Sequence, residues 1–425
     1  MRALHLDKVI PFISLLLYLV FFFATIQQVP FHPDEATQIY MSHDVDLLFS
    51  NPSSLIYHPE NELSPEQRYR LIDSPLPRTI IGVGRNIFRL APLPSDWNWS
   101  MSWEENQNKG ALPADSLLLL SRISLAVFVP VGLVFFYLML KNKVPWPYSL
   151  IATLFLGLNA VFLVHTRRAM AEGISFCSYF LIFYLLVKHS GKPWLIGIVA
   201  GFALLTKQTV SPILVLPLVY WTFELLFARR YASYLKALLV YFSVILLVYY
   251  MFNPIAWKDP LNVIALQIQT RVEFSRAQAA DYLALSSHLA ANTFRAGLIS
   301  WLANTFFAQP AFFDVGNYAP SLVHQIKTYQ SNFLNGLFSG WVNGVILLFL
   351  SLFGVFGSLR RLHIPVEKVD RTTLLLMTLS LLQTVFVLFF FPITFQRYYL
   401  LNLSLAVIWA VLGLHLIMQK IYHFK

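Results

Sequence analysis

The sequence predicts an all-α polytopic membrane protein of about ten transmembrane helices, and three observations predict it. The 425 residues are 57% hydrophobic and only 12% charged, whereas a soluble domain carries roughly 25% charged residues. Lipid must therefore act as the solvent for much of this apolar surface. The apolar residues form runs that approach the roughly 20 residues needed for one span. Basic clusters follow every second run.

The expected spans follow one another along the whole chain. The run at 193–206 is short, and its neighbour begins almost at once, so we expect these two to form a tight hairpin. The stretch 294–313 is apolar enough for an eleventh span, but polar residues interrupt it, and we expect an interfacial helix there. The ten runs are 9–27, 116–140, 146–164, 170–187, 193–206, 208–227, 236–252, 337–358, 372–391 and 398–418.

Lysine and arginine in the short loops predict the orientation, because cytoplasmic loops are enriched in both. This places both termini in the cytoplasm and makes residues 1–425 a single transmembrane domain. Two long segments, 28–115 and 253–336, then become outer loops, and we expect amphipathic juxtamembrane helices in both. The first run has no small-residue cleavage signature, so we expect a retained helix. The inner clusters are Arg2/Lys8, Lys141/Lys143, Lys188/Lys192, Arg229/Arg230/Lys236, Arg360/Arg361/Lys368/Arg371 and Lys420/Lys425.

Several classes of function are excluded by composition and by missing motifs. The net charge of +10 is spread in small clusters between apolar runs, which argues against a nucleic-acid partner. A single cysteine, Cys177, excludes an internal disulfide and a Cys-based zinc site. The sequence has no HExxH, CxxC or Walker motif. His32, His43 and His58 can ligate a metal with nearby acids, but solvated, exposed histidines are the simpler expectation. We predict no metal and no required cofactor, with a divalent cation as an open possibility.

The first candidate site is Phe31-His32-Pro33-Asp34-Glu35-Ala36, directly after the first span. Pro33 sets the chain direction, and Asp34 and Glu35 then open a helix, where the N-terminal dipole favours carboxylates. A carboxylate at the membrane boundary can act as a general base. The alternative is a first-turn acid that stabilises the helix and has no chemical role.

The second candidate lies where the third and fourth spans meet on the outer face. Arg167 and Arg168 depart from the positive-inside trend, and Glu172 lies just inside the fourth helix, where an uncompensated charge is costly. One alternative is that the two arginines pair with Glu172 and extend toward the interface. The other is that their guanidinium groups bind an anion, most simply a lipid phosphate.

Two further cations belong to the same predicted face. Lys207 lies at the outer end of the helix hairpin, and Arg397-Tyr398 precedes the last span. Each can be an interface anchor, or can bind a phosphate. Taken together, the acids and cations come from four different loops that the topology places at one depth. Such a cluster at a membrane surface suits reaction at a phosphate-linked lipid.

At these residues the chain resembles the C-type glycosyltransferase superfamily (GT-C). Within it, the chain is most similar to the protein O-mannosyltransferases and the bacterial aminoarabinose or mannosyl transferases, which use polyprenyl-phosphate sugars. The order, spacing and predicted side of the motifs agree from about residue 10 to 415. The motifs are Pro33 to Ala36, Ser121-Arg122-Ile123-Ser124, Arg168-Ala169-Met170-Ala171-Glu172, Gly201 to Lys207, and Gln396-Arg397-Tyr398.

The resemblance implies roles for individual residues. Asp34 would be the catalytic aspartate of the family, with Glu35 as its neighbour. Glu172 stands where the family often has Asp, and it would help to position the site. Lys207 would lie near the donor phosphate. Cations that would stabilise the leaving phosphate are Arg167, Arg168, Lys207 and Arg397, with Tyr398 beside them.

The function that follows is an inverting transfer of a sugar from a polyprenyl-phosphate donor to a hydroxyl of a lipid or glycan acceptor. The chain is shorter than the protein mannosyltransferases and has no soluble C-terminal domain, which favours a compact bacterial enzyme of the cell envelope. We expect it in the plasma membrane with the site on the outer face. The alternatives are a transporter or flippase for a lipid-linked substrate, and a membrane glycan polymerase or ligase.

Overall fold

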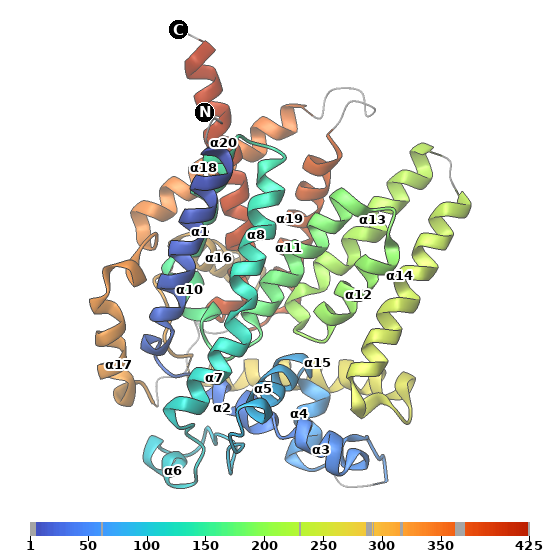
Figure 1. Cartoon of the computed structure of the whole chain (residues 1–425), viewed down its shortest axis with the longest axis vertical. Coiled ribbons are helices and arrows are strands. Elements are labelled where there is room, and N and C mark those ends of the chain that lie inside the picture. The colour runs from blue at the N-terminus through green and yellow to red at the C-terminus, as the bar shows by residue number, and fades with distance from the viewer. Residues whose placement is uncertain are drawn as a thin grey trace.

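The computed structural model describes residues 6–60, 63–228, 231–285, 291, 293–314, 318–361 and 370–423. These residues form helices joined by loops, with no β-strand among them. Long helices make one bundle, and shorter helices lie across one of its ends (Figure 1). The first turn of α1 and the last turns of α20 lie together at the opposite end. The prediction of an all-α polytopic membrane protein is therefore confirmed.

Within the described residues, six helical stretches are long and apolar enough to cross a membrane. A seventh is obtained if α9 (Trp146–Gly157) and α10 (Ala160–Thr166), which are bent by 61° relative to each other, count as one broken span. The six are α1 (Leu6–Ala24), α7 with α8 (Asp115–Ala126 and Phe128–Lys141), α14 (Tyr231–Phe252), α18 (Gly340–Arg361), α19 (Arg371–Phe390), and η10 with α20 (Gln396–Tyr399 and Leu400–His423).

The expected count of ten spans is not confirmed, although each of the ten apolar runs contains a helix. The remaining three runs correspond to α11 (Glu172–His189), α12 (Pro193–Leu204) and α13 (Ser211–Ala228). The helix α12 has only 12 residues, and α11 and α13 have 18 each. Of these three, α12 is shorter than the roughly 17–25 residues that one span needs.

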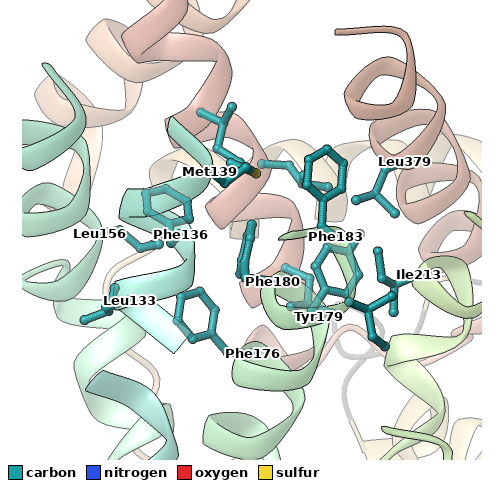
Figure 2. Close-up of a cluster of buried hydrophobic side chains, with 14 of the residues drawn as sticks. Leu133, Phe136, Met139, Leu156, Phe176, Tyr179, Phe180, Phe183, Ile213 and Leu379 are labelled. Atoms are coloured by element: carbon teal, nitrogen blue, oxygen red, sulfur yellow. The ribbon is translucent and has the colours of Figure 1, made fainter. Parts of the chain in front are cut away.

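The core of the bundle forms around α11, whose side chains are buried on nearly every side. Phe176, Tyr179, Phe180 and Phe183 project from α11 toward α8, α9, α13 and α19 (Figure 2). Edge-to-face contacts bring the aromatic rings together, with 5.0 Å between the centroids of Phe136 and Phe180. A helix that is apolar all round and buried in this way lies at the centre of a membrane bundle. It fixes the position of its own first residue, Glu172.

The closest pair of helices, α18 and α20, meets through glycine. A methyl group built on Gly354 or on Gly413 would overlap the backbone of the opposite helix. Small residues at such contacts allow two helix backbones to approach each other in a membrane, where dispersion contacts replace the hydrophobic effect. The Ser351 hydroxyl also donates to the carbonyl of Ala406, 2.8 Å away. This pair holds the start of α20, and hence Arg397, against the bundle.

The segments 28–115 and 253–336 fold as sets of helices, most of which are short. The first contains α2 (Pro33–Met41), α3 (Asp44–Ser50), α4 (Pro65–Ile72), α5 (Leu76–Ile87) and α6 (Trp103–Asn108). The second contains α15 (Pro260–Leu285), α16 (Phe294–Leu302), a π-helical turn η6 (Ala303–Phe307) and α17 (Ala319–Ser331). The helices α4 and α15 contact each other, so the two segments meet. The stretch 294–313 packs α16 on α19 and η6 on α18; its interfacial position stays a prediction.

Candidate active site

The start of α2 points its two acids, Asp34 and Glu35, in different directions. His32 is the N-cap: its Nδ1 accepts a hydrogen bond from the Asp34 N–H at 3.2 Å. The Glu35 carboxylate accepts one from the His32 N–H at 3.0 Å, which completes a capping box. Pro33 occupies the first helical position, where its missing N–H is harmless. This geometry turns Glu35 inward and leaves the Asp34 side chain one-third exposed.

Glu35 is fully buried and belongs to a structural ion pair. Its carboxylate accepts from Arg122 Nε and Nη2, both at 2.8 Å, and from the Ala169 N–H at 2.8 Å. Burial raises the pKa of Glu35, but the Arg122 guanidinium and these hydrogen bonds outweigh it and hold the pKa below its ordinary value. Arg122 also donates to the Val29 carbonyl at 2.8 Å. One ion pair thus joins α2, α7 and the loop before α11.

Asp34 lines a cavity of about 160 Å³ at the end of the bundle where α2 begins. The cavity brings together five of the residues predicted from sequence: Asp34 from α2, Glu172 from α11, Lys207 after α12, and Arg397 and Tyr398 from η10. These segments are far apart in the sequence. The cavity is also lined by residues that the sequence did not single out, among them Tyr69, Asp73, Arg271, Phe274, Gln278, Tyr282 and Asp314.

A row of charges crosses one wall of this cavity. Arg397 Nη2 lies 2.8 Å from Asp34 Oδ2, and Arg397 Nη1 lies 2.9 Å from Asp314 Oδ2. His32 Nε2 lies 3.1 Å from the same Asp314 oxygen. Burial raises the pKa of Asp314, but Arg397 and His32 outweigh it and hold that pKa well below the usual range. Asp314 therefore stays ionised, and it fixes Arg397 beside Asp34.

Asp314 was missed in the sequence, although a signal for it exists. It is the sole acidic residue between positions 282 and 366. It also lies in the second outer segment, on the face that carries the other candidates. One isolated acid in a long outer segment that is otherwise free of acids marks a place where the charge must have a partner.

The remaining charges in the cavity are also paired. The Lys207 ammonium donates to the Glu172 carboxylate and lies 5.0 Å from the centre of the Tyr398 ring. Arg271 Nη1 lies 3.5 Å from Asp73 Oδ1. Among the cavity-lining residues, three cations therefore face four carboxylates, which are Asp34, Asp73, Glu172 and Asp314.

Arg167 and Arg168 do not line this cavity. Arg167 is fully buried, donates to Asn335 Oδ1 at 2.9 Å, and lies over the rings of Phe21 and Phe22. Arg168 donates to the Phe312 carbonyl at 2.5 Å and so holds the loop that carries Asp314. The alternative in which the two arginines pair with Glu172 and extend to the interface is wrong: Glu172 pairs with Lys207, and both guanidinium groups are buried.

One group of side chains has the composition of a metal site. His32, Asp34 and Asp314 each offer one ligand atom, and these atoms lie within 4.8 Å of one another. The expectation of an exposed, solvated His32 is wrong, because this ring is fully buried between Asp314 and the start of α2. His43 bonds to the Tyr40 carbonyl and His58 to Glu60, so neither joins the group.

The chain is similar in fold to solved structures, but no close relative of its sequence was found among known proteins. No family model matches the chain, and no curated protein matches its sequence. The oligosaccharyltransferase of Archaeoglobus fulgidus, solved with Zn and sulfate, is similar over 96% of this chain and 50% of its own, with a TM-score of 0.54 and 13% identity. A complex of the enzyme from this organism with an inhibitory peptide and a dolichol-phosphate is similar over 99% of this chain and 52% of its own, with a TM-score of 0.54 and 12% identity.

A further similar structure is ArnT from Cupriavidus metallidurans bound to undecaprenyl phosphate. It covers 97% of this chain and 78% of its own at 15% identity, but its TM-score of 0.38 is too low to support an argument. This chain spans about half the length of the oligosaccharyltransferase chains that it matches. The predicted likeness is confirmed at the level of fold: the chain shares its fold with the solved archaeal oligosaccharyltransferase, at 12–13% identity.

Proposed function

We propose that the chain is an inverting glycosyltransferase that moves a sugar from a polyprenyl-phosphate donor to a hydroxyl of a lipid or glycan acceptor. One observation carries the proposal: Asp34, Glu172, Lys207 and Arg397 line a single cavity at the end of a membrane bundle with the GT-C fold. A carboxylate open to solvent beside several cations suits transfer at a phosphate-linked carbon. The archaeal oligosaccharyltransferase of similar fold was solved in complex with a dolichol-phosphate.

Asp34 is the proposed general base. Arg397 contacts its Oδ2, and within the described residues Oδ1 has no ion-pair or hydrogen-bond partner. Oδ1 takes the proton of the acceptor hydroxyl, and the hydroxyl oxygen attacks the anomeric carbon. The bond from that carbon to the phosphate oxygen breaks, and the phosphate leaves with the electron pair. In this proposal a single displacement takes place, and one displacement inverts the anomeric centre.

The cations act on the leaving group. A lipid phosphate diester carries one negative charge, and it gains a second as the sugar departs. Groups that strengthen their contacts as this charge develops accelerate the reaction. Lys207, with three donors and one carboxylate partner, is suited to this role. Arg271 is a second candidate, because its 3.5 Å pair with Asp73 is loose. Arg167 and Arg168 act in this proposal by holding α10 and the Asp314 loop.

The proposed location is a plasma membrane with the cavity on the non-cytoplasmic side. The basic clusters between spans support this orientation. The helices α2 to α6 and α15 lie across the end of the bundle opposite the two chain termini (Figure 1). A lipid-linked donor would then reach the cavity from the outer leaflet, between the bundle and the helices α4 and α15.

The test starts from the full chain purified in mild detergent. Mass analysis identifies the lipid phosphate that copurifies, and that carrier is then loaded with a radiolabelled sugar for a transfer assay. We expect transfer by the wild type and a loss of about 100-fold or more in Asp34→Asn, which keeps the size of the side chain but removes the base. Asp281→Asn, an exposed position on α15 outside the cavity, is the matched control. Full transfer by Asp34→Asn would remove the proposed base.

A lipid-substrate flippase is a second candidate, because of the 61° bend between α9 and α10. Broken helices at substrate sites are typical of transporters. Transport needs two compartments, whereas transfer does not. Turnover of a lipid-phosphate sugar by detergent-solubilised protein favours the transferase. Absence of turnover in detergent, together with movement of the same lipid across proteoliposomes, favours the flippase.

A further inference from the structure

Arg397 lies in the position where a metal ion would bridge the acids of this site. Its two terminal nitrogens contact one oxygen of Asp34 and one of Asp314, at 2.8 and 2.9 Å. The Nε2 atom of His32 lies 3.1 Å from the same Asp314 oxygen. His32, Asp34 and Asp314 also form the group whose possible ligand atoms lie within 4.8 Å of one another. The guanidinium and a metal ion would therefore compete for the same two carboxylates.

The hydrogen bonds of His32 define its tautomer. Because Nδ1 accepts from the Asp34 N–H, a neutral ring carries its proton on Nε2. That N–H donates to Asp314. A metal ligand needs a free lone pair on Nε2, so metal binding at this ring would displace the proton that now holds Asp314. Asp314 Oδ2 thus has two partners, His32 and Arg397, without an ion.

We propose that Arg397 replaces a divalent cation in this cavity, and that His32, Asp34 and Asp314 become a metal site when its charge is removed. Two carboxylates and one imidazole form a ligand set suited to Mn²⁺ or Zn²⁺. A dication would bind the two oxygens at about 2.0–2.6 Å. At that distance it would lie next to the guanidinium, with like charges in a buried place. One cation or the other occupies the position.

The proposal extends beyond sugar transfer, since it concerns metal binding and is tested without an activity assay. The chain purified in EDTA and then freed of it is titrated with Mn²⁺, and bound ion is measured by electron paramagnetic resonance. We expect no site in the wild type and one Mn²⁺ per chain in Arg397→Met, which keeps the length of the side chain. The double variant Arg397→Met/Asp314→Asn is the matched control, and it should lose the new site.

Thermal unfolding gives a second measurement. Since a ligand that binds the folded chain stabilises it, Mn²⁺ should raise the unfolding temperature of Arg397→Met and leave that of the wild type unchanged. The proposal is overturned if the wild type already binds one Mn²⁺ that Asp314→Asn removes, because the cluster would then hold a metal beside Arg397. It is equally overturned if folded Arg397→Met gains no site.

Discussion

Asp34 and Glu35 are neighbours in the chain, yet they occupy opposite environments. Glu35 points into the protein, is fully buried, and has a bidentate arginine and two backbone N–H groups as partners. Asp34 points into the cavity, remains one-third exposed, and shares a single oxygen with Arg397. The first carboxylate has little bonding capacity left, whereas the second retains a free oxygen for a substrate.

The difference between the two acids shows how one short motif serves both folding and the proposed chemistry. The capping box that His32 and Glu35 form at the start of α2 fixes the direction in which Asp34 points. Glu35 also reaches the backbone of Ala169, three residues before Glu172. The buried acid therefore positions the open one relative to the opposite wall of the cavity.

Removing the buried acid should have the largest effect. Glu35→Ala leaves Arg122 buried without its carboxylate, which costs about 3–5 kcal/mol. We expect poor accumulation and a strongly lowered unfolding temperature in detergent, measured by intrinsic tryptophan fluorescence. Asp34→Ala, the neighbouring control, should unfold close to the wild type. Equal stability of the two variants would show that the Glu35–Arg122 pair does not hold the segment.

A substitution of Lys207, on the opposite wall of the cavity, should lower both sugar transfer and stability. Lys207→Met removes a cation from the proposed phosphate site, and we expect transfer to fall by about 100-fold. It also leaves the buried Glu172 unpaired. Lys207→Met/Glu172→Gln should recover the unfolding temperature without recovering transfer. If the double variant regains both, Lys207 serves stability alone.

The loose ion pair on α15 should give a smaller effect. Arg271 and Asp73 lie 3.5 Å apart and are both partly exposed, so their pair contributes at most about 1 kcal/mol to stability. Arg271→Gln should leave the unfolding temperature unchanged and raise the KM for the lipid donor by about fivefold. Arg276→Gln, exposed on the same helix and outside the cavity, is the control. An equal KM in the two variants would exclude Arg271 from donor binding.

The smallest effect concerns pH. Folding lowers the pKa of Glu35 from its ordinary value of 4.5, so ionised Glu35 stabilises the folded chain. This contribution is complete above the unfolded pKa and is lost as the pH falls through the folded pKa. As the pH falls below about 4.5, the wild type should therefore lose stability faster than Glu35→Gln. Parallel unfolding curves for the two proteins over this range would contradict the assignment.

The sequence predicted much of the fold and part of the site. Apolar runs and alternating basic loops are enough to place helices, because the bilayer admits few alternatives. The convergence of Asp34, Glu172, Lys207 and Arg397 also followed from topology, which puts the ends of alternate helices on one face. The number of spans did not follow. Whether a 12-residue apolar helix such as α12 crosses alone depends on its packing against α14 and α11.

The pairing of the charges was not predictable from the sequence. Arg167 and Arg168 looked equivalent to Arg397 as phosphate ligands, but helix direction turns them away from the cavity into buried contacts. Asp314 and Arg271 come from the second outer segment, whose path over the bundle no local pattern specifies. Burial of His32 likewise depends on tertiary contacts. Side-chain partners across distant segments are decided by packing, which composition and periodicity do not encode.

The most direct test of the account is to measure sugar transfer and unfolding temperature on the same preparation of Asp34→Asn. Asp34 serves the chemistry of the cavity, whereas its buried neighbour Glu35 serves stability. The Asp34→Asn variant should therefore transfer sugar about 100-fold or more slowly and unfold at the temperature of the wild type. Wild-type transfer, or a loss of transfer that is matched by a loss of folding, would contradict it.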